Sequence, residues 1–90
     1  MKHINWNEEK NDWLRRVRGI SFDEVIVYIL EGDIIDVQQH PNQQKYKDQK
    51  IFFIRIKEYV FMVPYVEDDE KIFLKTIIPS RKATKKYLNK

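Results

Sequence analysis

Apolar side chains follow two spacings along this chain, a helical spacing in its first third and an alternating spacing after it. Residues 8–18 have the helical spacing and end at Gly19, with arginines near that end, where a helix dipole favours cations. Residues 22–31 place a second apolar set on one side of a helical wheel. Residues 4–6 suit a short strand ahead of both helices.

The second helix depends on its N-terminal signals, because Val-Ile-Val-Tyr-Ile-Leu also suits a β-strand. Ser21 can accept a hydrogen bond from the N–H of Glu24 while Glu24 reaches back, and Ile20 can pack against Val25. This combination of a capping box and a hydrophobic staple predicts a helix.

Alternating apolar and polar residues predict four strands, at 34–39, 51–57, 59–66 and 72–78. The short connections between the last three suit hairpins, whereas residues 41–49 are polar enough for an exposed loop. We therefore expect an antiparallel meander. Pro64 lacks a backbone donor, so its strand is expected to lie at an edge there or to bulge.

The strand from residue 51 predicts two different sheet faces. Phe52, Ile54 and Ile56 share one face, and Arg55 and Lys57 lie on the other. One face is therefore expected to be buried and the other partly basic.

A short helix capped by Ser80 is the last predicted element. Its side chains divide into two arcs. The apolar arc holds Ala83, Thr84, Tyr87 and Leu88. The basic arc holds Arg81, Lys82, Lys85 and Lys86. We expect the apolar arc, Tyr87 included, to pack.

Together these elements predict a single α+β domain over residues 1–90, with two N-terminal helices, the meander and a short C-terminal helix. The absence of cysteine removes disulfides and the usual zinc sites, and suits a reducing cytosol. The sequence contains no signal peptide and no apolar run of membrane-spanning length, so we expect a cytoplasmic protein without a membrane partner.

Charge is divided unevenly along the chain. Residues 71–90 contain seven Lys or Arg and no Asp or Glu, whereas the remaining residues contain ten basic and fourteen acidic side chains. A polyanion would therefore be attracted to the C-terminal end. The sequence has no glycine-rich phosphate loop and no metal-ligand spacing, so neither a metal nor another cofactor is expected.

Two groups of residues are candidates for chemistry. Arg81 and Lys82 are cations in the first turn of a helix, where they stabilise the fold poorly but would bind a phosphate well. The loop beginning at His40 offers an imidazole, amides, a phenol and lysines, which could bind RNA or move a proton at a ribose 2′-OH. Its candidate side chains are His40, Lys45, Tyr46, Lys47 and Lys50. Solvated charges and an ordinary exposed loop are the alternatives for the two groups.

Several segments occur in an order that resembles the BrnT-like toxins of bacterial type II toxin-antitoxin modules. They are INWNEEK, RGISFDEV, the polar loop, the meander and IIPSRKAT, and they cover nearly the whole chain. The matching residues are Trp6, Asn7 and Lys10, then Gly19-Ile20-Ser21-Phe22 with the acidic pair after it, and Arg81-Lys82-Ala83-Thr84.

This resemblance implies a RelE-like fold and a metal-independent endoribonuclease, in which the 2′-OH attacks the adjacent phosphate. Arg81 and Lys82 match two arginines of the family's C-terminal motif. With Lys50 and Arg55 they are expected to hold the scissile phosphate, while His40 or Tyr46 moves the proton. Further RNA contacts are expected from Lys45, Tyr46, Lys47, Lys85 and Lys86.

The implied partners are the RNA substrate and a cognate ribbon-helix-helix antitoxin, with operator DNA reached only through that antitoxin. An acidic antitoxin segment would be attracted to the basic C-terminal surface and could mask it.

The chain also departs from the family pattern. Gln49-Lys50 stands where the family has Glu-Arg, Val17-Arg18 stands where it has Lys-His, and the ending is shorter. A carboxylate that could act as the base is therefore missing. A non-catalytic module that binds RNA or an acidic protein, and an antitoxin-binding partner whose toxicity has decayed, are the alternative functions.

Overall fold

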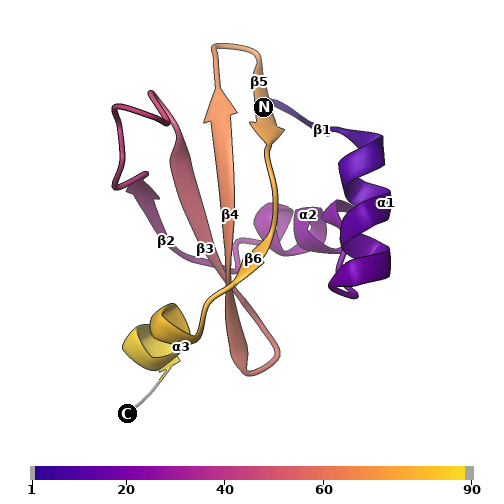
Figure 1. The fold of residues 1–90 in the computed structure, drawn as a ribbon, viewed down its shortest axis with the longest axis vertical. Helices are drawn as coiled ribbons and strands as arrows, with labels where there is room; N and C mark the ends of the chain where they lie inside the picture. The colour runs from indigo at the N-terminus through magenta and orange to yellow at the C-terminus, as the bar shows by residue number, and fades with distance from the viewer. Residues whose placement is uncertain (1, 89–90) are drawn as a thin grey trace.

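Helices and strands fill most of the chain in a computed structural model, which describes residues 2–88 (Figure 1). Their order is β1 (His3–Trp6), α1 (Glu8–Val17), α2 (Phe22–Leu30), β2 (Ile34–Gln39), β3 (Lys50–Ile56), β4 (Tyr59–Glu67), β5 (Lys71–Leu74), β6 (Ile78–Pro79) and α3 (Arg81–Leu88). Every helix and strand predicted from the sequence is found, except that the strand expected over 72–78 is divided into β5 and β6.

The strands form one mixed, open sheet in the order β1-β5-β4-β3-β2, and β6 pairs with β4 beyond the end of β5. Strands β2 to β5 are antiparallel neighbours, which confirms the meander. Strand β1 was expected only as a strand, and it pairs in parallel with β5. The sheet is therefore not antiparallel throughout, and the fold class is α+β with a mixed sheet.

Local caps fix both N-terminal helices. Asn7 accepts a hydrogen bond from the N–H of Lys10 at the start of α1, and Gly19 follows the end of α1 with a φ of +70°. Ser21 accepts from the N–H of Glu24 at 3.3 Å, as expected for the start of α2. The prediction of a helix at 22–31 is confirmed to within one residue.

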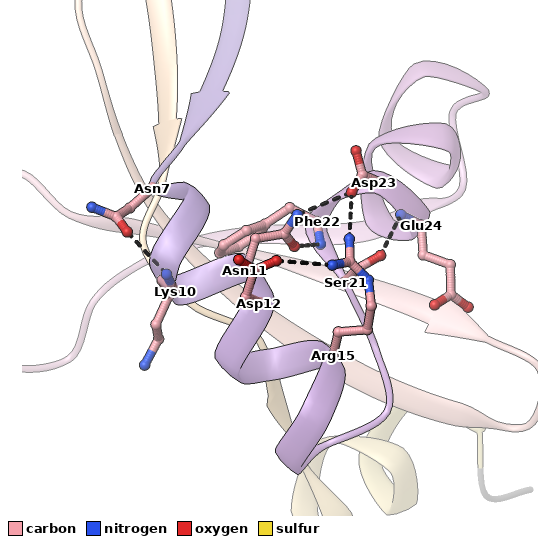
Figure 2. A network of polar contacts seen from close by, with 9 residues as sticks. All are labelled: Asn7, Lys10, Asn11, Asp12, Arg15, Ser21, Phe22, Asp23 and Glu24. Atoms are coloured by element: carbon pink, nitrogen blue, oxygen red, sulfur yellow. Dashed lines mark hydrogen bonds and ion pairs between the residues drawn. The ribbon is translucent and has the colours of Figure 1, made fainter.

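A buried asparagine joins the two helices (Figure 2). Asn11 is 1 % exposed, accepts a hydrogen bond from the N–H of Phe22 at 2.7 Å and donates to the Asp23 carboxylate at 2.9 Å. Arg15 binds the same carboxylate at 3.0 Å. The carboxylate of Glu24 points away from Ser21 in this view, so the prediction that Glu24 reaches back is wrong. Asn11 of α1 binds the N–H of the next residue, Phe22, instead.

The sheet has an apolar cluster on each face. Phe52, Ile54 and Ile56 lie in the larger cluster, beneath α1 and α2, as their shared face predicted. The alternate residues Ile51 and Phe53 lie in a second cluster, beneath α3. This second face is basic only at its hairpin end, where Arg55 is exposed as predicted, because the apolar arc of α3 covers the rest of it along β3.

Pro64 explains why β5 and β6 are separate. It lies inside β4, opposite Ile51 of β3, and its carbonyl accepts a hydrogen bond from the N–H of Lys75 at 2.8 Å. The missing N–H of Pro64 points to the same side, where a continuous neighbouring strand would need it. The break in strand pairing therefore falls in the segment between β5 and β6, which lies beside β4. Strand β4 itself neither bulges nor lies at an edge there.

The segment between β5 and β6 is fastened to α1. Ile77 is fully buried, and its carbonyl accepts a hydrogen bond from the Arg18 guanidinium. This contact fixes the chain just before it crosses to α3. None of the helices within residues 2–88 is long and apolar enough to cross a membrane.

Candidate functional site

Helix α3 is fastened to β4 by the two hydroxyl residues of its first turns. Ser80 donates its N–H to the Val60 carbonyl at 3.0 Å, and its side chain accepts from the N–H of Ala83 at 3.0 Å. The hydroxyl of Thr84 accepts from the N–H of Val60 at 2.9 Å and donates to the Ser80 carbonyl at 2.7 Å. Both backbone groups of Val60 on this side are thereby satisfied, so α3 completes the outer edge of β4.

Four exposed cations project from this helix: Arg81, Lys82, Lys85 and Lys86. None of the four forms an ion pair with a carboxylate within residues 2–88. The ammonium of Lys86 lies 5.2 Å from the ring centroid of Tyr87. The first turn therefore combines unneutralised side-chain charge with the free N–H groups of a helix N-terminus, and both favour an anion.

A hollow of about 250 Å³ lies between α3 and the sheet. Its lining includes the apolar side chains of Phe53, Met62 and Ala83. Its polar lining consists of Gln38, Ser80, Lys82, Lys86 and Tyr87. The four cations are thus divided, because Lys82 and Lys86 line the hollow while Arg81 and Lys85 do not.

Tyr87 is fixed beside this hollow by a carboxylate of β2. Its hydroxyl donates to Asp36 at 2.5 Å, and the Gln38 amide donates to that carboxylate at 2.7 Å and to the Tyr87 oxygen at 3.0 Å. The Tyr87 hydroxyl lowers the pKa of Asp36, and the Asp36 carboxylate raises the pKa of Tyr87. Tyr87 also packs on Phe53 at 5.5 Å, as expected for the apolar arc.

Sequence reasoning did not identify Asp36 and Gln38 as parts of this site. Both alternate with Val37 on β2, so their placement on one face could be predicted. The register decides which face this is. It pairs Asp36 with Phe53, on the face that α3 covers, and it shifts at a bulge after Ile34.

The structure does not bring Lys50 to the cations of α3. Lys50 and Phe52 are two residues apart on β3, so their side chains lie on the same face of the sheet. Phe52 belongs to the cluster beneath α1 and α2, on the face opposite to α3. Its ammonium lies 3.3 Å from Glu67, which also binds Lys2 at 2.8 Å. The hydrogen bond from Lys2 is the largest of the effects that lower the pKa of Glu67. Lys50 is therefore a member of a separate ion cluster.

Arg55 has the strand parity of Phe53 and therefore belongs to the α3 side of the sheet, but it lies at the β3–β4 hairpin. Its guanidinium donates to the Lys57 carbonyl at 3.0 Å and forms an ion pair with Glu58 at 3.1 Å. Arg55 does not line the hollow beside α3.

The loop after β2 is closed by its own hydrogen bonds. The Gln43 amide donates to the carbonyls of His40 and Gln49, and His40 Nδ1 accepts from the N–H of Asn42 at 3.1 Å. The His40 and Tyr46 rings lie 4.3 Å apart. Because Nδ1 is occupied, Nε2 is the His40 atom available to a ligand.

The two lysines of this loop, Lys45 and Lys47, are exposed, and the Lys45 ammonium lies 5.3 Å from the Tyr46 ring centroid.

Within the described part of the chain, no group of three or more His, Cys, Asp or Glu side chains could hold a metal ion.

Comparisons of this chain with protein-family models, with curated proteins and with solved structures find no match in any of the three.

Proposed function

We propose that this protein is a BrnT-like toxin with a RelE-like fold, an endoribonuclease that binds the RNA backbone on α3. The carrying observation is the set of four α3 cations without an ion-paired carboxylate among the described residues, next to a hollow with an apolar floor. By contrast, Lys50 and Arg55 are each paired with a glutamate.

The arrangement of the elements supports the family proposal without depending on charge. Two helices precede a meander, and a helix with the sequence Arg81-Lys82-Ala83-Thr84 follows it. Thr84 of this motif accepts a hydrogen bond from β4, so the motif attaches α3 to the sheet as well as supplying the cations.

In the proposed reaction the ribose 2′-OH attacks its own 3′ phosphorus and the bond to the 5′ oxygen breaks. The products are a 2′,3′-cyclic phosphate and a free 5′-OH. Arg81 and Lys82 would stabilise the charge that develops on the phosphoryl oxygens. His40 and Tyr46 stay candidates for the proton transfer. Lys50 belongs to the separate ion cluster with Glu67, so we do not expect it to contact the scissile phosphate.

Expression of the chain without a partner tests this proposal. We expect growth arrest and RNA fragments that end in 2′,3′-cyclic phosphates. The double variant Arg81→Ala, Lys82→Ala should lose about 100-fold or more in cleavage. A matched control, Arg16→Ala, Lys71→Ala, removes the same charge from exposed positions outside α3. Equal cleavage by the two double variants would refute the site.

The partner proposed is a ribbon-helix-helix antitoxin whose acidic segment covers α3, with operator DNA bound only through it. Because exposed charges are screened by salt, raising the salt concentration should weaken the complex. A complex that is insensitive to salt would contradict an electrostatic mask.

A non-catalytic module that binds RNA or the antitoxin through the same surface is the second candidate. It is favoured by the separation of Lys50 from Arg81 and Lys82, because fewer groups than expected then meet at one phosphate. This function predicts salt-dependent RNA binding with intact RNA after long incubation. Detection of the cyclic phosphate product would exclude it.

A further inference from the structure

We infer that the outer edge of β2 is a binding surface for a second copy of this chain, and that the Asp36 carboxylate, held by Tyr87, blocks this surface. The surface is distinct from the cations of α3, and the inference does not depend on the proposed function. It goes beyond that function by assigning an occupant to one edge of the sheet.

Strand β2 is the outermost strand on one side of the sheet (Figure 1), and within residues 2–88 its only strand partner is β3. The N–H of His40 donates to the Gln49 carbonyl at 2.8 Å. Hydrogen bonds to a neighbouring antiparallel strand recur at every second residue. Counting back from His40, Gln38 directs its backbone groups toward β3, whereas Val37 directs its N–H and carbonyl outward.

This edge carries two exposed apolar side chains. Ile35 is 40 % exposed and Val37 is 45 % exposed. An edge strand of this kind is a template for pairing with another chain, and natural proteins protect such edges with bulges and charges. Strand β2 has both protections, because its pairing with β3 shifts at a bulge after Ile34 and because Asp36 precedes Val37.

The Asp36 carboxylate occupies the hydrogen-bonding position that another strand would need. Its Oδ1 accepts from the outward N–H of Val37 at 2.8 Å. Its Oδ2 accepts from the Tyr87 hydroxyl at 2.5 Å and from the Gln38 amide at 2.7 Å. Because Tyr87 belongs to α3, the helix holds the carboxylate at the strand edge. Another strand can therefore pair here only after Asp36 releases the N–H of Val37.

The sequence of β2 suits a second copy of itself in a register centred on Val37. A two-fold axis there places Val37 opposite its own copy, so the two residues can exchange both backbone hydrogen bonds. Asp36 then lies opposite Gln38 of the second copy on the same face, which joins a carboxylate to an amide donor. A register centred on Asp36 would place two carboxylates opposite each other, which is unfavourable. Each copy has one such edge, so the pairing closes as a dimer.

Removal of the Asp36 carboxylate tests the inference. Sedimentation velocity of the full chain over a range of concentrations measures the dissociation constant of the dimer. We expect Asp36→Ala to lower this constant by about tenfold or more, because neither copy then has to break the hydrogen bond from Val37 to a charged group. Tyr87→Phe should lower it by a smaller factor. Asp33→Ala is the matched control, since it removes the same charge from an exposed residue just before β2.

Two additional substitutions verify that the association uses β2. Val37→Pro removes the outward N–H, and an edge strand tolerates proline where that N–H faces solvent. Val37→Lys keeps the N–H but places two ammonium groups opposite each other in the dimer. Added to Asp36→Ala, either change should restore the monomer. Urea unfolding verifies that each variant folds.

A synthetic peptide with the sequence of residues 34–39, Ile-Ile-Asp-Val-Gln-Gln, distinguishes a second copy from other occupants. It should compete with the self-association of Asp36→Ala, whereas a peptide of the same composition in scrambled order should not. Equal competition by the two peptides would assign the edge to any extended segment and overturn the inference.

The inference is also wrong if Asp36→Ala associates no more strongly than Asp33→Ala. Association that survives both Val37→Pro and Val37→Lys would locate the contact outside β2 and overturn it as well. Aggregates that grow without limit would contradict a closed two-fold dimer. None of these measurements uses RNA, so their failure leaves the proposed ribonuclease untouched, and a failure to cleave RNA leaves this inference untouched.

Discussion

Replacing Thr84 by valine tests whether one hydroxyl holds the proposed site to the sheet. Thr84→Val keeps the branched shape but removes the acceptor of the Val60 N–H, which lies 2.9 Å away on a fully buried residue. The Ser80 carbonyl loses less, because the backbone N–H of residue 84 also binds it, at 3.0 Å. The main cost is therefore one buried donor without a partner.

A buried donor without a partner lowers the free energy of unfolding by about 1–3 kcal/mol. Taking about 2 kcal/mol as the central value, the midpoint of thermal unfolding should fall by about 8–16 °C for a domain of this size. Thr84→Ser keeps the hydroxyl, so its loss should be smaller and should come from the missing methyl group alone.

Urea unfolding followed by tryptophan fluorescence measures the difference, and amide hydrogen exchange at Val60 localises it. We expect faster exchange at Val60 in Thr84→Val than in Thr84→Ser. If Thr84→Val were as stable as the unchanged protein, the hydrogen bond from the sheet would contribute nothing and the attachment of α3 would depend on apolar packing alone.

Three further predictions concern stability and pH. Asn11→Leu should destabilise the protein by about 2–4 kcal/mol in urea, because the N–H of Phe22 loses a buried acceptor and a charged hydrogen bond is lost as well; a cost below about 1 kcal/mol would contradict this. Burial raises the pKa of Tyr65 to about 12, so its contribution to stability should be complete below about pH 10 and fall as the pH rises toward 12; Tyr65→Phe should reduce the alkaline loss in pH-dependent melting, and an unchanged loss would contradict this. The pKa of Asp36 is lowered chiefly by Tyr87, so this contact stabilises the fold above the usual carboxyl pKa and is lost on acidification; Tyr87→Phe should show less acid sensitivity in melting experiments, and equal sensitivity would contradict the assignment.

Local signals predicted the helices well because their causes are local. The cap at Ser21 and the stop at Gly19 involve residues within one turn, and both are found where expected. The contribution of Asn11 to the same cap could not be read from the sequence, because it depends on how two helices pack.

Pairing between distant strands was the part that sequence patterns could not supply. Alternation placed Arg55 opposite Phe52, but it did not show that Ile51 and Phe53 on the same face would be covered by a helix. The break of the last strand was missed because its cause, Pro64, lies on the neighbouring strand.

The candidate site shows the same division. Arg81 and Lys82 follow from the position of a helix start, and their exposure agrees with the sequence pattern. The separation of Lys50 from them depends on which face of β3 its side chain occupies and on the register of the sheet. Its ion pair with Glu67 depends on contacts between β3 and β4. Thr84 was expected to pack, yet its hydroxyl makes the decisive contact.

Strand β1 has a consequence for how the chain folds. It pairs His3 with Lys71, nearly the whole length of the sequence apart, whereas β3 and β4 are joined by a tight hairpin. Long loops are slow to close, so β1 is expected to dock after the meander has formed. Until then the outer edge of β5 is an open strand edge that can pair with another molecule. The yield of refolding should therefore fall as protein concentration rises, because the four residues of β1 are what covers the edge of β5 in the folded protein.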